Sequence, residues 1–358
     1  PSLLRLMGTS DAVFGMAVGY MRLLLFTMPA SFGIFLLASL LRGAGDSTTP
    51  LIFQVASVLL NAALDPVLMF GWLGAPKLGL NGTAVATVIS ALLALVALAL
   101  YLQRRRHPMA PDWAHLSVDW PTWGQTFRLG LPTMVQQSLI SIGMVVVVGI
   151  VNRFGDAAVA ALGAGGRIDQ LAFLPAMTLG MAVSTMAGQN IGARRFDRVQ
   201  QTFWWGVALS GGLTLLATFV AVTWPRTLLS WFVNDPAVIT YGVDYLYIVG
   251  SLYLLFAVMF ISNGVINGAG HTLVATLISL VSLWAVRVPL AVFLSRHLGV
   301  QGVWWAMPAG FAMSMLFSLG YFASGRWKKS AIMPAPPPAS EDAAADESDA
   351  CAIAQNEL

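Results

Sequence analysis

The chain has 358 residues, of which 57% are hydrophobic and only 10% are charged, and its formal net charge is +3. A soluble domain carries about 25% charged residues because its surface faces water, so this composition excludes a soluble protein and requires lipid around the molecule. The basic residues stand in short clusters between apolar runs. That pattern is typical of charges flanking a membrane and argues against a nucleic-acid partner.

Nine runs of about 20 or more mostly apolar residues follow one another along the chain, and each is long enough to cross a hydrocarbon core of about 30 Å. Lipid offers no partner for unpaired backbone groups, so each run is predicted to be a helix. The runs are continuous, whereas the strands of a barrel alternate in polarity. The sequence therefore predicts an all-α, polytopic membrane protein. The predicted helices, numbered one to nine, are 20–41, 49–71, 80–102, 127–152, 156–187, 200–223, 241–266, 272–294 and 301–323.

Two segments differ in composition from these helices. Residues 103–126 contain a run of three arginines and three tryptophans, which predicts a cytoplasmic linker at the membrane interface. Residues 330–358 are rich in Pro, Ala, Asp and Glu and predict a disordered, acidic tail. The tail holds the only cysteine, Cys351, so no internal disulfide is expected. The remaining domains are residues 1–102, with three helices, and residues 127–329, with six.

The distribution of basic residues predicts the orientation in the membrane. The loops after helices one, three, five and seven, together with the C-terminal flank, carry eleven Arg and Lys residues, and the opposite side carries five. Because basic loops stay in the cytoplasm, the first set and the C-terminal tail are predicted to be cytoplasmic. The eleven are Arg42, Arg104, Arg105, Arg106, Arg128, Arg194, Arg195, Arg198, Arg326, Lys328 and Lys329.

The chain contains an internal repeat. Gly-Ala-Gly at residues 43–45 recurs at residues 268–270, and Leu-Gly-Leu-Asn-Gly at residues 78–82 recurs as Leu-Gly-Val-Gln-Gly at residues 298–302. Helices one to three therefore match helices seven to nine, and helices four to six have no counterpart in this chain. We expect a protein of twelve helices in two pseudo-symmetric six-helix lobes, of which this chain lacks the first three. Parallel repeats of this kind are a transporter plan, with the substrate site between the halves.

Three motifs resemble one known family. They are LRGAGDSTTP at residues 41–50, KLGLNGTAVAT at residues 77–87 and GQNIGA at residues 188–193. Over residues 5–325 the chain resembles the multidrug and toxic compound extrusion (MATE) family, on its DNA-damage-inducible, prokaryotic side. The resemblance implies a pair of six-helix lobes and export of amphiphilic, often cationic, organic compounds driven by inward flow of H⁺ or Na⁺.

Asp65 is the strongest candidate for a functional residue. Ionisable residues at membrane depth are costly and are therefore functional candidates. Asn61 and Asp65 are four residues apart and share a helix face. Pro66 removes a backbone donor and leaves a carbonyl free for a cation. The alternative is a structural carboxylate that caps a broken helix or pairs with an arginine.

The resemblance implies more about this site. Related transporters build a cation site in the N-terminal lobe from an Asn and an Asp four apart, a Thr on the next helix and an Asp on the first helix. Asn61, Asp65 and Thr83 match three of these positions, and the fourth would precede this chain. The expected coupling ion is H⁺ or Na⁺, with Asp65 as the Na⁺ ligand in the second case, and no other cofactor is expected. Some relatives instead use a Glu and an Asp in the C-terminal lobe. Here helix four has no acid near residues 136–138, and helix seven has none between Tyr245 and Gly270.

Other polar residues in the predicted helices have two interpretations each. Gln136 and Gln137 follow a proline on helix four and would contact substrate or form helix–helix hydrogen bonds. Arg167 and Asp169 on helix five are two residues apart, so they point to different sides and either line a cavity or brace the lobe. Arg287 would act as an internal counter-ion or as a structural brace.

The sequence thus predicts a monomeric antiporter in the cell (inner or plasma) membrane. Its partners would be the lipid bilayer and small amphiphilic organic cations. The alternative function is a flippase for lipid-linked saccharides of the same wider superfamily. An enzyme is not expected, because the sequence has no HExxH, GxSxG or Walker lysine motif.

Overall fold

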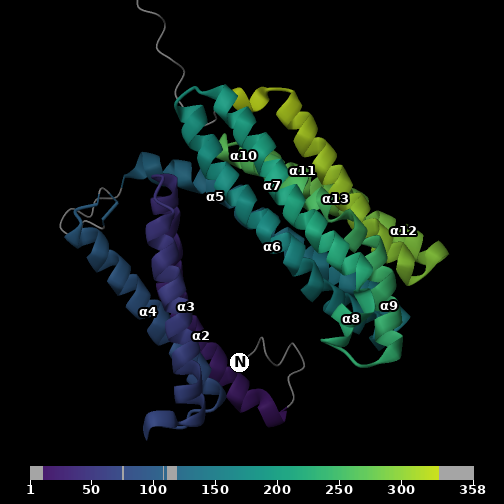
Figure 1. Cartoon of the computed structure of the whole chain (residues 1–358), viewed down its shortest axis with the longest axis horizontal. Helices are drawn as coiled ribbons and strands as arrows, with labels where there is room; N and C mark the ends of the chain where they lie inside the picture. The colour runs from purple at the N-terminus through teal and green to yellow at the C-terminus, as the bar shows by residue number, and fades with distance from the viewer. Residues whose placement is uncertain (1–10, 75, 108, 111–118, 330–358) are drawn as a thin grey trace, which may run out of the picture. The chain divides into compact units, whose positions relative to one another are not determined.

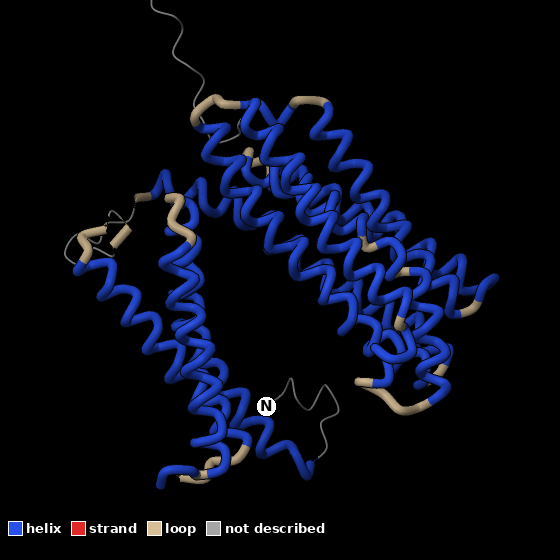
Figure 2. The backbone as a smooth tube through the Cα atoms, in the orientation of Figure 1, coloured by secondary structure: helices blue, strands red, loops and turns tan. Residues whose placement is uncertain are grey.

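The computed structural model describes residues 11–74, 76–107, 109–110 and 119–329. Every regular element among these residues is a helix (Figure 2), which confirms the predicted all-α class. In this described part of the chain, eight helices are long and apolar enough to cross a membrane, or nine if one bent pair counts as a single span. The predicted tail at residues 330–358, with Cys351, lies outside the described residues.

The chain divides into two compact units, Pro1–Asp119 and Trp120–Leu358, which are called the N-lobe and the C-lobe below. The boundary falls inside the segment predicted as a linker. The C-lobe begins with a helix at Trp120, seven residues earlier than the sequence predicted. Pro121 lies in the first turn of that helix, where a missing N–H costs nothing, so a proline there does not indicate a loop.

The N-lobe consists of three long helices (Figure 1). They are α2 (Asp11–Gly43), α3 (Thr48–Phe70) and α4 (Leu80–Arg104). Helix α4 packs along both α2 and α3, which contact each other much less. Asp46 begins α3 by accepting hydrogen bonds from the backbone N–H groups of Thr48 and Thr49, and Gly71 ends it in the left-handed conformation, with φ of 78°.

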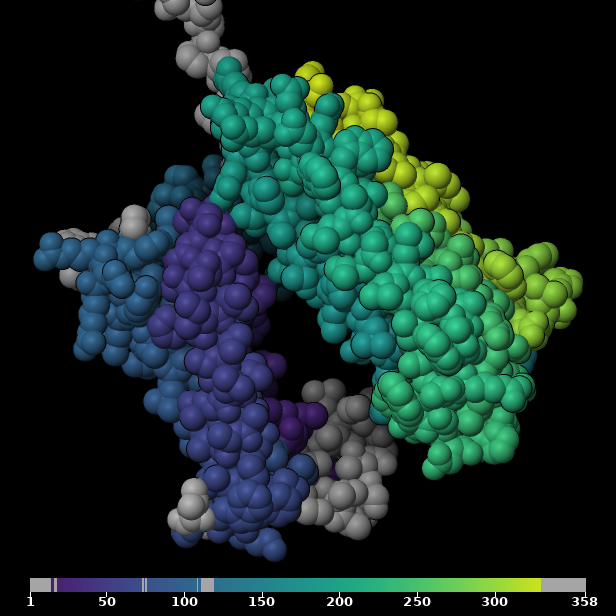
Figure 3. Space-filling model, viewed as in Figure 1, coloured from purple at the N-terminus to yellow at the C-terminus, as the bar shows by residue number. Residues whose placement is uncertain are grey.

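The C-lobe contains the remaining helices, which pack against one another along their lengths (Figure 3). Its centre is the pair α6 and α10, which approach closely at Gly180 and Gly264, where a side chain on either glycine would meet the backbone of the other helix. Its elements are α5 (Trp120–Val151), α6 (Asp156–Gly192), α7 (Phe196–Thr223), α8 (Pro225–Ser230), α9 (Pro236–Ile248), η3 (Gly250–Leu252), α10 (Leu254–Gly268), α11 (Thr272–Leu280), η4 (Val281–Arg287), α12 (Val288–Leu298) and α13 (Val300–Ala323).

Two predicted helices of the C-lobe are interrupted. The seventh is broken into Pro236–Leu252 and Leu254–Gly268, which are bent by 47°. The eighth contains η4, a π-helical segment, between α11 and α12. Neither interruption was predicted, because no proline stands at residues 249–253 or inside η4 and the apolar runs continue through both.

The internal repeat has a structural counterpart. Gly79 and Gly299, which precede α4 and α13, have φ of 57° and 61° and ψ of −134° and −143°. Three residues later, Gly82 and Gly302 each lie so close to the preceding helix that a Cβ atom would collide with a backbone carbonyl, of Leu68 in the N-lobe and of Leu294 in the C-lobe. The same local geometry therefore occurs in both lobes at the positions that the sequence repeat aligns.

Candidate functional site

The candidate site in the N-lobe lies where α3 packs against α4. The Nδ2 group of Asn61 donates to Oδ1 of Asp65 over 3.4 Å and to Oγ1 of Thr87 over 3.3 Å. The Thr87 hydroxyl in turn donates to the carbonyl of Thr83 over 2.9 Å. One turn further along, the Ser57 hydroxyl donates to the carbonyl of Ser90. Polar side chains of α3 thus bond to α4 at two successive levels.

Thr83, which the resemblance implies is part of the cation site, lies on α4 one turn before Thr87. Its hydroxyl donates to the carbonyl of Leu80 over 2.9 Å, within its own helix. The hydroxyl that reaches Asn61 belongs to Thr87, one turn later on the same face. Thr87 was missed by the sequence analysis although it ends the motif at residues 77–87, and the i, i+4 spacing from Thr83 was the signal that could have found it.

Asp65 is half-buried and keeps acceptor capacity. A carboxylate has about four lone-pair sites, and the long bond from Asn61 uses one of them. In the described part of the chain, no Arg, Lys or His lies within ion-pair distance of Asp65. Pro66 has no N–H, so the carbonyl of Ala62 lacks its helical donor. The Asp65 carboxylate and the Thr87 hydroxyl are thus linked through Asn61, and oxygen ligands of this kind suit a proton or an alkali cation.

A second polar feature of the N-lobe lies at the start of α4. The Oδ1 atom of Asn81 is buried and accepts no hydrogen bond from the described residues. The side chain faces Gly19 of α2, so this acceptor lies between α2 and α4 rather than between α3 and α4. The described residues contain no group of three His, Cys, Asp or Glu side chains that could hold a metal ion.

The C-lobe contains a carboxylate bound by two phenols. The hydroxyl of Tyr245 donates to Oδ2 of Asp169 over 2.5 Å, and the hydroxyl of Tyr253 donates to Oδ1 over 2.6 Å. The guanidinium of Arg287 lies over the ring of Phe311, 5.1 Å from its centre. The structure thus brings Asp169 together with two tyrosines that the sequence analysis did not single out.

The other candidate residues of the C-lobe lie apart from this cluster. Arg167 is exposed, and its guanidinium lies 5.6 Å from the ring centre of Phe232. Gln136 donates to Oγ of Ser279 over 2.7 Å and accepts from Thr276 over 3.4 Å, which is the helix–helix alternative of the two interpretations. Gln137 is exposed.

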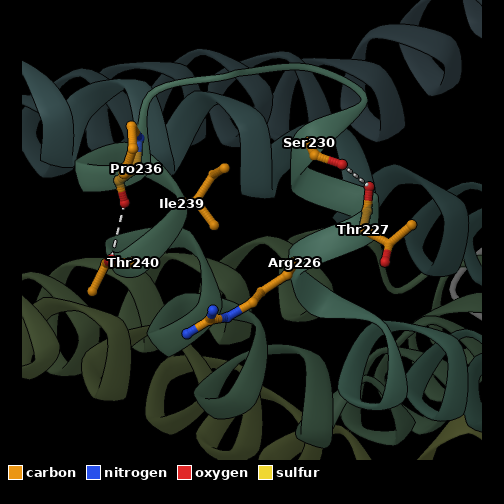
Figure 4. Close-up of a pocket in the computed structure, with 6 residues that line it drawn as sticks. All are labelled: Arg226, Thr227, Ser230, Pro236, Ile239 and Thr240. Atoms are coloured by element: carbon orange, nitrogen blue, oxygen red, sulfur yellow. Dashed lines mark hydrogen bonds between the residues drawn. The ribbon is translucent and has the colours of Figure 1, made fainter.

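An open groove of about 410 Å³ lies at the α8–α9 corner of the C-lobe (Figure 4). Its polar groups are the guanidinium of Arg226 and three hydroxyls, two of which already donate to backbone carbonyls. None of the predicted site residues lines it. The lining residues are Arg226, Thr227, Ser230, Pro236, Ile239 and Thr240.

Comparisons with known proteins agree on one family. A family model described as MatE matches residues 1–67 and 132–293. The probable multidrug resistance protein YoeA of Bacillus subtilis is 37% identical over 338 residues, which are 92% of this chain and 72% of that protein. The probable multidrug resistance protein YpnP of the same species is 30% identical and matches 91% of this chain and 72% of its own length. Among solved structures, the MATE transporter VcmN of Vibrio cholerae in its bent form superposes with a TM-score of 0.82 at 22% identity, over 92% of this chain and 73% of that one.

Proposed function

The chain belongs to the MatE family of multidrug efflux transporters, and from this premise we propose that it exports amphiphilic, often cationic, organic compounds in exchange for H⁺ or Na⁺. The observation that carries the proposal is the half-buried carboxylate of Asp65, which has no cationic partner among the described residues and is bonded only by Asn61. A carboxylate in that setting is costly unless it serves a function.

The N-lobe cluster explains how a cation could bind and leave. Asp65 lies five residues before the end of α3 at Phe70, or about 7 Å along the axis at 1.5 Å per residue. By the predicted orientation this is the outer half of the membrane. A bound H⁺ or Na⁺ neutralises the carboxylate, while the free carboxylate needs water or polar groups around it. The ion therefore stabilises one arrangement of the lobe more than another, and this difference in affinity is what coupling requires.

Asn61 and Thr87 have supporting roles in this proposal. Asn61 orients the carboxylate and links it to α4. Thr87 fixes Asn61, because its own proton is used on the Thr83 carbonyl and its oxygen is left to accept from the amide. Na⁺ would take the Asp65 carboxylate, the Thr87 oxygen and the Ala62 carbonyl as ligands, whereas a proton needs only the carboxylate.

We also propose the placement of the protein. Its helices span the bilayer of the cell membrane several times, its C-terminal tail lies in the cytoplasm and it works as a monomer. The excess of basic residues on one set of loops supports the orientation.

The test is transport by the full-length protein in liposomes. An imposed pH gradient or Na⁺ gradient should drive movement of a fluorescent organic cation, and the gradient that succeeds identifies the coupling ion. Asp65→Asn should lower gradient-driven transport at least about tenfold, because one lost interaction of about 1.4 kcal/mol already changes an equilibrium tenfold. The matched control is Asp197→Asn at an exposed carboxylate in the first turn of α7. Wild-type transport by the Asp65 variant would remove this residue from the mechanism.

A further inference from the structure

The bend in the seventh span has one tyrosine before it and one at the break. Tyr245 lies on α9, before the bend, and Tyr253 lies at the break itself, immediately before α10. The two segments meet at 47°. Both phenols donate to the carboxylate of one residue, Asp169 of α6, through its two different oxygens. A single side chain of a neighbouring helix therefore holds the first half of the broken span and the residue at the break.

The surroundings show that this arrangement is specific. Tyr245 is 2% exposed and Tyr253 is 0% exposed. The ring of Tyr245 fits against α6 only because residue 165 is glycine, since a Cβ atom there would lie 2.5 Å from the ring. Phe256 stacks on Tyr253 with ring centres 5.5 Å apart. Packing therefore fixes the position of each tyrosine ring, and the two short hydrogen bonds join both phenols to Asp169.

Arg287 supplies a positive charge near this carboxylate without bonding to it. The side chain packs on Gly310 and over Phe311, and its charge acts on Asp169 electrostatically. Its Nε atom is buried with no hydrogen-bond acceptor among the described residues. A buried donor without an acceptor is costly. Its positive charge also opposes cation binding at Asp169, so this cluster is not a second coupling-ion site.

The segment that carries Arg287 contains further buried polar atoms without a hydrogen-bond partner among the described residues. Arg287 ends η4, and two other side chains of this π-helical segment, Ser282 and Trp284, also have buried polar atoms without a partner among the described residues. Three of these atoms thus come from seven consecutive residues. π-Helical turns are rare and are frequent at functional sites. Polar atoms without a partner, gathered on one such turn, would gain hydrogen bonds if the segment adopted another arrangement.

We propose that Asp169 is a positioning residue that clasps the bent span, and that Arg287 is its alternative partner when the span straightens. In the bent state the carboxylate holds Tyr245 and Tyr253, and Nε of Arg287 has no acceptor among the described residues. In the straighter state Asp169 releases Tyr253 and pairs with Arg287. No ion binds or dissociates in this exchange of partners. Its effect is to couple the bending of the seventh span to the position of Arg287 in the C-lobe.

The proposal is tested by the distance across the bend. Nitroxide spin labels are placed on the exposed residues Thr240 of α9 and Asn267 of α10, in full-length protein whose Cys351 is replaced by Ser. With 1.5 Å per residue along arms that meet at residue 253, a 47° bend gives a backbone separation of about 37 Å, and a straight span gives about 40 Å. Pulsed electron–electron double resonance resolves the two populations.

Two substitutions should act in opposite directions. Tyr253→Phe removes one hydroxyl from the clasp and should increase the longer population at least about threefold, whereas Arg287→Met removes the alternative partner and should suppress it. Combining the two should return the distribution toward the shorter distance. The matched control is Tyr247→Phe, at a half-exposed tyrosine of α9 outside the cluster. Identical distributions for Tyr253→Phe and Tyr247→Phe would overturn the proposal, even if both variants were less stable.

The link between the Asp169 clasp and transport rests on the proposed function. The clasp proposal and the coupling proposal at Asp65 can be refuted separately. If Tyr253→Phe lengthens the distance and transport persists unchanged, the clasp exists and is not part of the transport cycle. If Asp65→Asn transports normally and the distances still shift as expected, the coupling proposal fails and the clasp stands. Where Arg287→Met does not fold, Arg287→Lys replaces it. Lys keeps the charge but loses the planar, two-pronged geometry, so it should lower the longer population less than Met.

Discussion

Replacing Gly165 of α6 by alanine tests the packing on which the clasp depends. The new Cβ atom would lie 2.5 Å from Cδ1 and 2.7 Å from Cε1 of Tyr245. Because an ordinary carbon–carbon contact is about 3.5 Å or more, the ring must move by about 1 Å. The phenol now donates to Asp169 over 2.5 Å, and a displacement of that size moves it to the limit of hydrogen-bonding distance.

The cost follows from two contributions. Forcing an extra methyl group into a packed core costs about 1–3 kcal/mol, and a hydrogen bond to a charged group contributes about 1.5–3 kcal/mol. The Tyr245 ring can relieve the clash by moving away and losing its hydrogen bond, so the overpacking cost and the hydrogen-bond cost do not add in full. We therefore expect Gly165→Ala to destabilise the protein by about 2–4 kcal/mol.

Gly163→Ala is the matched control, two residues earlier on the same helix. Nothing lies within 4 Å of a Cβ atom at that position, and alanine is the better helix former by about 1 kcal/mol. Thermal unfolding in detergent should therefore show a lower midpoint for Gly165→Ala and an unchanged or higher midpoint for Gly163→Ala. Equal midpoints would show that Tyr245 is not fixed against α6, and the account of the clasp would lose its basis.

Three further outcomes are expected. Thr87→Val should impair gradient-driven transport more than Thr83→Val does, because only Thr87 bonds to Asn61; liposome transport rates compare them, and a larger effect at Thr83 would favour the assignment implied by family resemblance. Gly302→Ala should cost about 1–3 kcal/mol of stability, because its Cβ atom meets a backbone carbonyl, whereas Gly320→Ala on the same helix meets nothing; unfolding midpoints decide. The hydroxyl and backbone N–H of Thr49 hold the pKa of Asp46 below its usual value, so the stabilising effect of this helix cap is present above the unfolded-state pKa and is lost as the pH falls through the lower folded-state pKa. Asp46→Asn should remove that part of the acid dependence in an unfolding series between about pH 5 and pH 2.

The spans could be predicted from the sequence because an apolar run is a local property. Its length alone decides whether it crosses the bilayer. Asn61 and Asp65 were found for a similar reason, since the i, i+4 spacing places both on one face of one helix. The cluster around Asp169 could not be found in this way, because Tyr245 and Tyr253 are 76 and 84 residues away along the chain. The bend beside Tyr253 could not be predicted from a proline, because none stands at residues 249–253. The contacts made there are with Asp169 of α6, far away in the sequence.

The start of α5 shows a second limit of local patterns. Residues 120–126 contain Pro, Gly and two tryptophans, a composition shared by interfacial loops and by the first turn of an interfacial helix. Trp120 and Trp123 are both exposed, so burial gives no periodic signal over these residues. The tertiary structure resolves this ambiguity in favour of the helix.

The repeat also shows how two lobes with the same helices differ in chemistry. Aligning Pro66 of α3 with Pro289 of α12 places the run NAALDP of the N-lobe opposite WAVRVP of the C-lobe. Each proline removes a backbone donor at the equivalent level of its span. The N-lobe has a carboxylate, Asp65, one residue before its proline, and the C-lobe has a guanidinium, Arg287, two residues before its proline. A negative side chain near a carbonyl without its helical donor attracts a cation. A positive side chain there repels a cation and needs a hydrogen-bond acceptor from elsewhere in the lobe. These opposite charges, one residue apart in the alignment, favour the proposed cation binding in the N-lobe and leave the C-lobe with the internal acceptor Asp169, whose partner changes in the proposed exchange.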